Sequence, residues 1–475
     1  MKVVLVLAPF DQLKAAGFKS ARVKRVYGYS VPLGIAYLAA MLEQAGHDVS
    51  VLDPCPDKFS INEIVDWILS QRPDVLGIST LTHMSQQAYD LANEAKRRMP
   101  VVPIVLGGAH CTSFPETVMP KCPNIDVVVI GEAEGRIVAL VEALDQGDSL
   151  DFIPGLIFKD AKTGRIKDTG APQKVRDLDS LPFPARLLFD HLKYNPFPDQ
   201  VRKSPVTNLI TSRGCPWRKC KFCFEGGKYM PRYRRRSPEN VIEELIEVKK
   251  QGFGGVAIWD DNFCVSEKWV SRFCELFRES QLDLTWTCYG RVDQITEQMV
   301  RDISSAGCFS IYFGFESGDQ SVLDFIQKGT TLDQARKAIA ACRRVKLEVR
   351  GSFILGMPGD TPELAKKSIR FARELDLDFV KFMLYTPEHG TELYEVAMNC
   401  GRIVNEGFSG SLTRATYVPE GYESTEQLER IALKANRSYV FRPGFVWRKM
   451  KSIRSWQDIR KYFDGLLLML SLRRY

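Results

Sequence analysis

Three cysteines lie within nine residues, in the stretch CPWRKCKFC at positions 215–223. A closed structural zinc site needs four ligands, usually in two pairs, and the chain has no second C-x-x-C and no H-x₃₋₅-H pair. A thioredoxin-like redox pair at Cys220 and Cys223 would leave Cys215 unexplained. Three thiolates on one short loop suit three irons of a 4Fe–4S cluster, which leaves the fourth iron open to a ligand. We therefore expect Cys215, Cys220 and Cys223 to be the metal ligands.

The elements around this loop form a series of strands, each followed by a helical stretch. The strands are predicted at 207–212, 255–260, 284–290, 309–316, 348–356 and 379–385. Several helices have clear starts, such as Ser237 before Pro238 and the capping box of Thr331 with Gln334. Six such units predict a partial (β/α)6 barrel over 201–400. Because barrel chemistry lies at the carboxyl ends of strands, the cysteine loop belongs at that end.

The first third of the chain also alternates strands and helices. The strands are predicted at 3–9, 48–53, 74–80, 103–108 and 126–132. They lack polar alternation, which is typical of a parallel sheet covered on both faces. The pattern predicts an α/β, Rossmann-like, doubly wound domain over 1–145 that binds ligands beyond the carboxyl ends of its strands. No dinucleotide fingerprint follows the first strand, so the glycines at these ends could also be ordinary loop residues.

The remaining segments have simpler patterns. Residues 146–200 are predicted to be a linker with a β-hairpin at 153–170. Residues 401–475 are predicted to be a mainly helical C-terminal region.

At this point the second domain resembles the radical S-adenosylmethionine (SAM) superfamily. Together the two domains resemble its cobalamin-binding branch, both the class B radical SAM methyltransferases and the anaerobic Mg-protoporphyrin monomethyl ester cyclases. The resemblance covers residues 1 to about 395. The usual loop of that superfamily is C-x₃-C-x₂-C, whereas this sequence has C-x₄-C-x₂-C, one residue longer between Cys215 and Cys220.

The resemblance implies three contacts with the adenine of SAM. Phe222, just before the last cysteine, matches the aromatic residue that borders the adenine. In the stretch GSFILGMPG, Ile354 and Gly356 match the residues that lie beside it.

The resemblance also implies polar contacts with the rest of SAM. Asp260 and Asp261 in WDDNF are expected at its ammonium group, and Arg291 at its carboxylate. Glu316 and Ser317 in FGFESG are expected at the ribose hydroxyls.

For the first domain the resemblance implies bound cobalamin. The expected contacts are at the carboxyl ends of the strands, namely Ser79, Thr80, Gly107, Gly108 and Glu132. The D-x-H-x-x-G signature, whose histidine ligates cobalt, is absent, so we expect cobalamin without a protein histidine on the metal. His110, in the glycine loop, is expected to be a polar wall of this pocket.

Composition places the protein in the cytoplasm. Of its 475 residues 45% are apolar and 26% charged, which is ordinary for a folded protein. The N-terminus lacks the long apolar region of a secretory signal, and LLLMLSL at 466–472 is too short to span a bilayer. Twelve cysteines without an export signal favour a reducing compartment.

The formal charge of +7 predicts acidic partners. Part of the excess surrounds the cysteine loop: Arg213, Arg218, Lys219, Lys221, Lys228, Arg232, Arg234, Arg235 and Arg236. This cluster could be a solvated face or could dock an acidic flavodoxin or ferredoxin that delivers electrons. Nucleic acid is a weaker alternative, because the C-terminal RNA-binding barrel of tRNA-modifying radical SAM enzymes is not visible.

The C-terminal segment is basic and amphipathic. Trp447, Met450, Ile453 and Trp456 recur at helical spacing. We expect a helix packed on the barrel, with a helix on a membrane surface as the alternative.

The resemblance therefore implies a radical SAM enzyme that binds a 4Fe–4S cluster, SAM and cobalamin. The expected reaction is methylation of an unactivated carbon of a small molecule, lipid or peptide. One alternative is a cobalamin-dependent radical SAM cyclase or rearrangement enzyme. A more distant alternative is a non-enzymatic iron–sulfur or cobalamin sensor.

Overall fold

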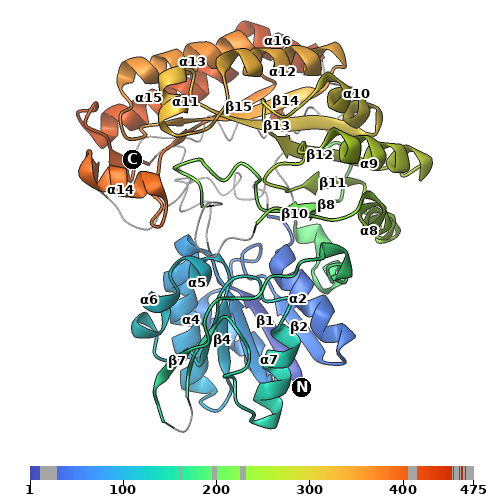
Figure 1. Cartoon of the computed structure of the whole chain (residues 1–475), viewed down its shortest axis with the longest axis vertical. Coiled ribbons are helices and arrows are strands. Elements are labelled where there is room, and N and C mark those ends of the chain that lie inside the picture. The colour runs from blue at the N-terminus through green and yellow to red at the C-terminus, as the bar shows by residue number, and fades with distance from the viewer. Residues whose placement is uncertain are drawn as a thin grey trace. The chain divides into compact units, whose positions relative to one another are not determined.

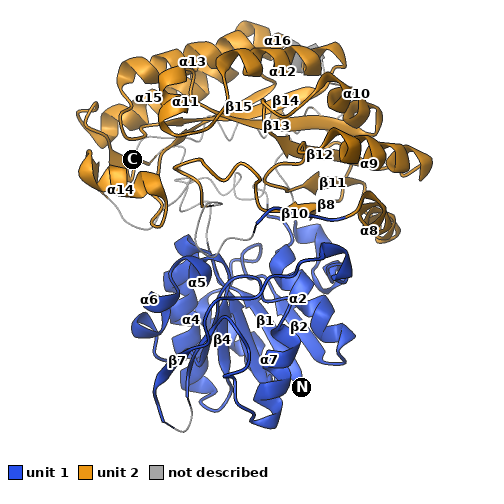
Figure 2. Cartoon of the chain, viewed as in Figure 1, with its two compact units in different colours: residues 1–11, 29–194, 227–236 blue, residues 12–28, 195–226, 237–475 orange. Residues whose placement is uncertain are grey.

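The computed structural model describes most of the chain. It covers residues 1–10, 29–160, 163–194, 200–224, 232–404 and 414–451, with the isolated positions 453, 459, 462–463 and 466. The described residues form two compact units (Figure 2). The first contains residues up to Tyr194 and the short segment 232–236, and the second contains the rest. Each unit is built around its own sheet (Figure 1).

The first unit contains a sheet with the strand order β2-β1-β3-β4-β5-β6-β7. Its strands are β1 (Lys2–Leu7), β2 (Asp48–Leu52), β3 (Val75–Ser79), β4 (Ile104–Gly107), β5 (Val127–Val129), β6 (Leu156–Lys159) and β7 (Ile166–Asp168), with the two-residue β10 (Arg234–Arg235) in the later segment. Its helices are α2 (Leu33–Gln44), α3 (Ile61–Gln71), α4 (Ser85–Arg98), α5 (Ala109–Ser113), α6 (Pro115–Lys121) and α7 (Ile137–Gln146). Short 3₁₀ turns lie at Thr82–Met84, Leu178–Ser180, Arg186–Leu188 and His191–Lys193.

Strands β1 to β5 are parallel, as their continuous apolar sequences predict. Separate apolar clusters cover the two faces of the sheet, one with α3 and α4 and the other with α2 and α7. The doubly wound prediction is therefore confirmed. The predicted hairpin is β6 and β7, and it extends this sheet as its antiparallel edge, since β6 pairs with β5.

The second unit contains a sheet of six parallel strands with the order β15-β14-β13-β12-β11-β8. Its strands are β8 (Val206–Leu209), β11 (Gly255–Ile258), β12 (Thr285–Gly290), β13 (Cys308–Glu316), β14 (Glu348–Leu355) and β15 (Phe379–Leu384), with the short β9 (Ser212–Arg213), β16 (Arg402–Ile403) and β17 (Tyr417–Val418). Its helices are α8 (Pro238–Lys250), α9 (Glu267–Glu279), α10 (Glu297–Ser305), α11 (Gln320–Phe325), α12 (Leu332–Arg344), α13 (Pro362–Leu375), α14 (Glu392–Asn399), α15 (Thr425–Val440) and α16 (Pro443–Lys451). This sheet is the predicted partial barrel.

The two faces of this second sheet differ in polarity. Alternate residues such as Ile311, Phe313 and Phe353 pack with α8, α9, α10, α12 and α13 in one apolar core. The residues between them include Ser310 and Arg350, whose Nε donates a hydrogen bond of 2.9 Å to the Ser310 hydroxyl. An apolar face directed at helices and a polar opposite face are the pattern of a barrel with an interior open to ligands.

The C-terminal region continues the barrel. Asn436 of α15 lies beside the edge strand β15, where its side-chain amide bonds both the N–H (3.1 Å) and the C=O (2.9 Å) of Phe382. The edge of the sheet is thereby covered rather than exposed. In the part of the chain that the structure describes, no helix is long and apolar enough to cross a membrane.

Candidate active site

The cysteine loop follows β8, at the carboxyl end of the second sheet. Cys215, Cys220 and Cys223 are half-buried, whereas eight of the other nine cysteines are buried, and all twelve are free thiols. The backbone N–H of Lys221 donates to the carbonyl of Ile326 (3.0 Å), and the carbonyl of Lys221 accepts from the N–H of Leu393 (2.8 Å). Two separate segments therefore hold the loop.

The donor set fits a 4Fe–4S cluster. The three accessible thiols lie on one loop, and burial raises the pKa of Cys220 while the charges of Lys328 and Arg291 lower it. Among the described side chains no three of His, Cys, Asp and Glu are grouped closely enough to hold a single metal ion. Three sulfur ligands with an open fourth position are the set that such a cluster uses when it binds a further ligand.

Trp217 accommodates the extra residue of the loop. Its indole N–H donates to the carbonyl of Gln327 (2.8 Å), and the guanidinium of Arg291 lies 5.0 Å from the ring centroid. The next residue, Arg218, has a left-handed backbone with φ +51°. The longer spacing thus forms a turn fixed by the segment 326–329.

The two aspartates after β11 are placed differently. Asp260 is buried and accepts hydrogen bonds from the backbone N–H and the hydroxyl of both Thr211 and Ser212. Burial raises the pKa of Asp260 to about 6, against the effect of these bonds. Asp261 is exposed, and its carboxylate accepts a hydrogen bond from the N–H of Gly214. The surrounding protein raises the pKa of Asp261, and this hydrogen bond partly opposes the rise. Only Asp261 is accessible to a ligand.

Glu316 ends β13 at an irregularity of the ladder with β14, where its φ of +60° turns the chain. Its carboxylate accepts from the ammonium of Lys328 at 2.6 Å, and both side chains are at least nine-tenths buried. Ser317 is also buried, with its hydroxyl 3.3 Å from that of Ser368. Arg291 donates to the carbonyl of Lys328 at 2.7 Å, so this arginine lies beside the same pair.

Two of the three residues expected at the adenine share one apolar cluster. Phe222 and Ile354 both pack against the buried group that includes Met357 and Tyr385. Gly356 directly follows β14 with φ +78°, and a Cβ atom there would lie 2.5 Å from Leu428. The structure therefore brings the cysteine loop and the carboxyl ends of β13 and β14 to one place in the second unit.

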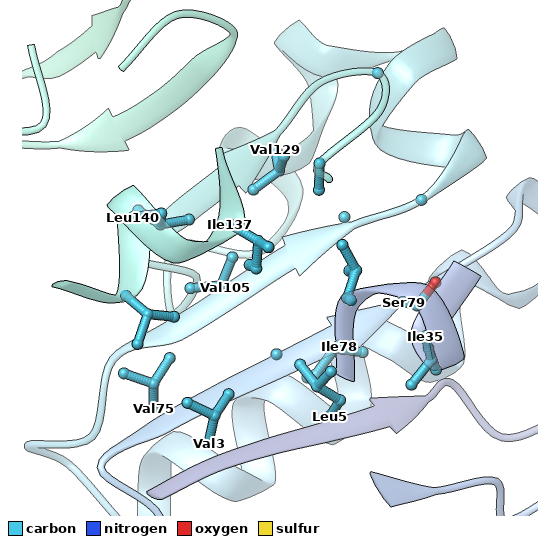
Figure 3. Close-up of a pocket in the computed structure, with 17 residues that line it drawn as sticks. Val3, Leu5, Ile35, Val75, Ile78, Ser79, Val105, Val129, Ile137 and Leu140 are labelled. Carbon is cyan, nitrogen blue, oxygen red and sulfur yellow. The ribbon is translucent and has the colours of Figure 1, made fainter. Parts of the chain in front are cut away.

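The first unit contains an apolar pocket between its sheet and helices α2 and α7 (Figure 3). Apolar residues of both helices line it, among them Ile35, Ile137 and Leu140. Of the residues expected to contact cobalamin, Ser79, Gly107 and Gly108 line this pocket. A Cβ atom at Gly107 would meet only Val129, at 3.7 Å, so the absent side chain leaves room that a ligand can use.

Three other residues expected here make internal contacts instead. Thr80 is fully buried, and its hydroxyl donates to the carbonyl of Leu81 at 3.0 Å. Glu132 forms an ion pair with Arg234. His110 does not line this pocket but lies 2.8 Å from the hydroxyl of Tyr89, and burial lowers its pKa to about 4. Apart from Ser79 and the glycines, the residues that line the pocket are apolar.

The basic residues around the cysteine loop do not form one free surface. Arg234 is paired with Glu132, Arg236 is buried, and Lys221 lies 3.0 Å from Glu392. Lys228 lies outside the described residues.

Sequence reasoning missed Lys328 and its neighbour Gly329. In the sequence they lie just before the helix cap at Thr331, where a lysine and a glycine are ordinary loop residues. The role of Lys328 depends on its contacts with the carboxylate of Glu316 and the ring of Phe222. The sequence around Lys328 does not indicate either contact.

Comparisons with known proteins match both domains. A family model for the B12 binding domain matches residues 19–141, and one for the radical SAM superfamily matches residues 209–372. The chain is 34% identical to an uncharacterized methyltransferase, PH0819, of Pyrococcus horikoshii over 93% of each chain. It is 29% identical to the anaerobic magnesium-protoporphyrin IX monomethyl ester cyclase of Rubrivivax gelatinosus, over 92% of this chain and 78% of that one.

The fold also matches a solved structure. The radical SAM methyltransferase TsrM from Kitasatospora setae, with cobalamin and a [4Fe–4S] cluster bound, superposes with a TM-score of 0.69 at 18% identity, over 93% of this chain and 89% of that chain. The two domain matches and the methyltransferase relative agree with the geometry of the cysteine loop. The chain therefore belongs to the cobalamin-dependent branch of the radical SAM superfamily, whose cofactors are a 4Fe–4S cluster, SAM and cobalamin.

Proposed function

We propose that this enzyme methylates a weakly activated carbon of a small molecule, lipid or peptide. Such a carbon has no lone pair, so it cannot attack the methyl group of SAM directly. When bound, the cluster supplies the electron that cleaves one SAM, and cobalamin supplies the methyl group, which a second SAM replaces. The observation that carries the proposal is the loop of three half-buried thiols next to the buried pair of Glu316 and Lys328.

The chain's own residues bind and orient SAM. We assign Phe222 and Ile354 to the adenine, because they border one apolar cluster, and Gly356 because it directly follows Leu355 at the end of β14. We assign the exposed carboxylate of Asp261 to the ammonium group, with buried Asp260 fixing the backbone of Thr211 and Ser212 before the cysteine loop.

The remaining polar groups of SAM meet three further residues. Arg291 is assigned to the carboxylate, and Glu316 and Ser317 to the ribose hydroxyls. Because Glu316 is held by Lys328 at 2.6 Å, its carboxylate has one fixed orientation.

For cobalamin we assign the pocket of the first unit. Ser79, Gly107 and Gly108 line it, and we expect Thr80 and Glu132 to support the backbone at the ends of β3 and β5. We expect cobalamin to bind without a protein histidine on cobalt, because the sequence lacks the D-x-H-x-x-G signature.

The partners and the location follow from this chemistry. The cluster requires a reducing electron donor, and we propose a flavodoxin or ferredoxin in the cytoplasm, where the twelve free thiols stay reduced. Nucleic acid is not proposed as a substrate.

A peripheral membrane contact is a further proposal for α16. Phe445 packs on Tyr439, at 6.0 Å between ring centroids, while Val446, Trp447 and Met450 stay exposed on a basic helix. Flotation with anionic vesicles should recover the intact chain but not a chain that ends at residue 440. Equal recovery of both would show that this helix does not contact lipid.

The stoichiometry of products tests the reaction. Replacing one C–H by C–CH₃ in this way consumes two SAM and two electrons, and releases one methionine, one 5′-deoxyadenosine, which carries the abstracted hydrogen, and one S-adenosylhomocysteine. We expect equal amounts of the two nucleosides for each methylated product from the anaerobically reconstituted enzyme. Deoxyadenosine and product without S-adenosylhomocysteine would instead indicate the cyclisation named for the Rubrivivax relative.

A further inference from the structure

The ammonium of Lys328 lies between the ribose-binding carboxylate and the cysteine loop. It is 2.6 Å from Glu316, and 5.8 Å from the centroid of Phe222, which lies between two cluster cysteines in the sequence. The side chains of Lys328 and Glu316 are only 10% and 7% exposed. A buried pair of opposite charges, Lys328 and Glu316, therefore lies beside the cysteine loop.

The cysteine loop and Arg291 hold the backbone at Lys328 in place. The carbonyls of Ile326, Gln327 and Lys328 accept, in turn, from the N–H of Lys221, the indole of Trp217 and the guanidinium of Arg291. Gly314 leaves room for the pair, because a Cβ atom there would lie 3.1 Å from the ammonium. The charge of Lys328 thus has one position relative to the loop.

Charges in such a place act on a cluster. Interactions between charges are stronger in the protein interior than in water, and the ammonium of Lys328 lies 5.8 Å from the ring of Phe222 on the cysteine loop. Reduction of a 4Fe–4S cluster adds one electron and makes it more negative. Local charge is one of the factors that set its reduction potential.

We propose that Lys328 is a positioning residue that orients Glu316 toward the SAM ribose and, through its fixed positive charge, raises the reduction potential of the cluster. Glu316 opposes the second effect, so the pair sets the potential by the balance of its two charges. The inference rests on the proposed cluster and SAM site but not on the identity of the reaction.

The test measures midpoint potentials by EPR-monitored titration of the full-length, anaerobically reconstituted protein. SAM, cobalamin and substrate are left out, so that a failure of methyl transfer cannot affect the result. The variants are Lys328→Met, Glu316→Gln and the double variant. Iron and sulfide content and the circular dichroism spectrum verify that each retains a full cluster and its fold.

The two single variants should shift the potential in opposite directions. Lys328→Met should lower it, since the carboxylate is left without its cation, and Glu316→Gln should raise it. The double variant should return close to the wild-type value. If Lys328→Met holds less than a full cluster, the sign of the Glu316→Gln shift alone decides. Unchanged potentials, or shifts of the same sign, would overturn the electrostatic role.

Binding of SAM tests the positioning role separately. Lys328→Met should weaken SAM binding, measured by calorimetry on the reconstituted protein, by about tenfold, because Glu316 loses the partner that orients it. An unchanged SAM affinity would overturn that part of the proposal.

Discussion

The indole of Trp217 lies against the α-carbon of Gly329, so closely that no side chain fits at residue 329. Gly329 also has φ +69°, a conformation that favours glycine. This contact holds the lengthened cysteine loop on the segment that carries Lys328. Substitution of Gly329 should therefore affect the cluster more than the fold as a whole.

We expect Gly329→Ala to reduce the iron bound after reconstitution and to lower the melting temperature. Gly147→Ala is the matched control, because Gly147 has the same φ of +69° but nothing within 4 Å of its Cβ position. The control should cost only the backbone strain, about 1 kcal/mol, and retain full iron content. A Gly329→Ala protein with a full cluster would contradict the anchoring role of Trp217.

The three cysteines of the loop should be individually essential. Changing Cys215, Cys220 or Cys223 to alanine should abolish both the iron–sulfur absorbance and the formation of 5′-deoxyadenosine from SAM under reducing conditions. Cys264→Ala is the control, since Cys264 is buried in the core and its loss should cost about 1 kcal/mol without affecting iron. If Cys215→Ala kept its cluster while Cys264→Ala lost it, the ligand assignment would be wrong.

Much of the fold was predictable because each strand is a short apolar run bounded by turn residues. The sheet that carries the site depends on runs such as 309–316, and the structure places β13 at Cys308–Glu316. Residues at strand ends, including Asp260 and Glu316, were therefore recognisable as members of one edge.

The direction of individual side chains was not predictable. Asp260 and Asp261 are adjacent acids, and which of them is buried depends on Thr211 and Ser212, which lie 49 and 48 positions earlier. Likewise Glu132 is paired with Arg234, 102 positions later, which no pattern near Glu132 indicates. The role of Lys328 likewise depends on a contact with Phe222, which lies far from it in the sequence.

A substitution at Gly107 allows a test of the proposed cobalamin pocket with little effect on folding. A methyl group there would make one ordinary contact, with Val129 at 3.7 Å, but would reduce the space in the pocket. We expect Gly107→Ala to keep its melting temperature and to bind cobalamin about tenfold more weakly, measured by equilibrium dialysis. The control is Gly46→Asn, at a helix end where asparagine tolerates the left-handed backbone. Unchanged affinity in Gly107→Ala would place cobalamin elsewhere.

The buried carboxyl of Asp360, next to the proposed SAM site, should make the stability of the protein depend on pH. Burial raises its pKa to about 6, although the N–H groups of Gly356 and Thr361 and the hydroxyl of Tyr422 donate to it. Since the folded pKa lies above the unfolded value of 3.8, the favourable contribution of the neutral acid is lost as pH rises from about 4 to about 6. The ionised carboxylate then depends on its three donors, and Glu363 adds a negative charge near Tyr422.

Tyr422→Phe removes one of those donors, so the pKa of Asp360 should rise further and the loss of stability should grow with pH. We expect a small loss at pH 5, where Asp360 is protonated, and a loss of about 2 kcal/mol at pH 8, where a buried carboxylate lacks a hydrogen bond. Tyr439→Phe is the matched control, because the Tyr439 hydroxyl is buried too but donates to the uncharged carbonyl of Leu377 at 2.8 Å. Its loss should be the same at every pH. Denaturant unfolding of both variants at pH 5 to 8 measures this difference, and parallel losses across that range would show that Tyr422 does not act through the ionised form of Asp360.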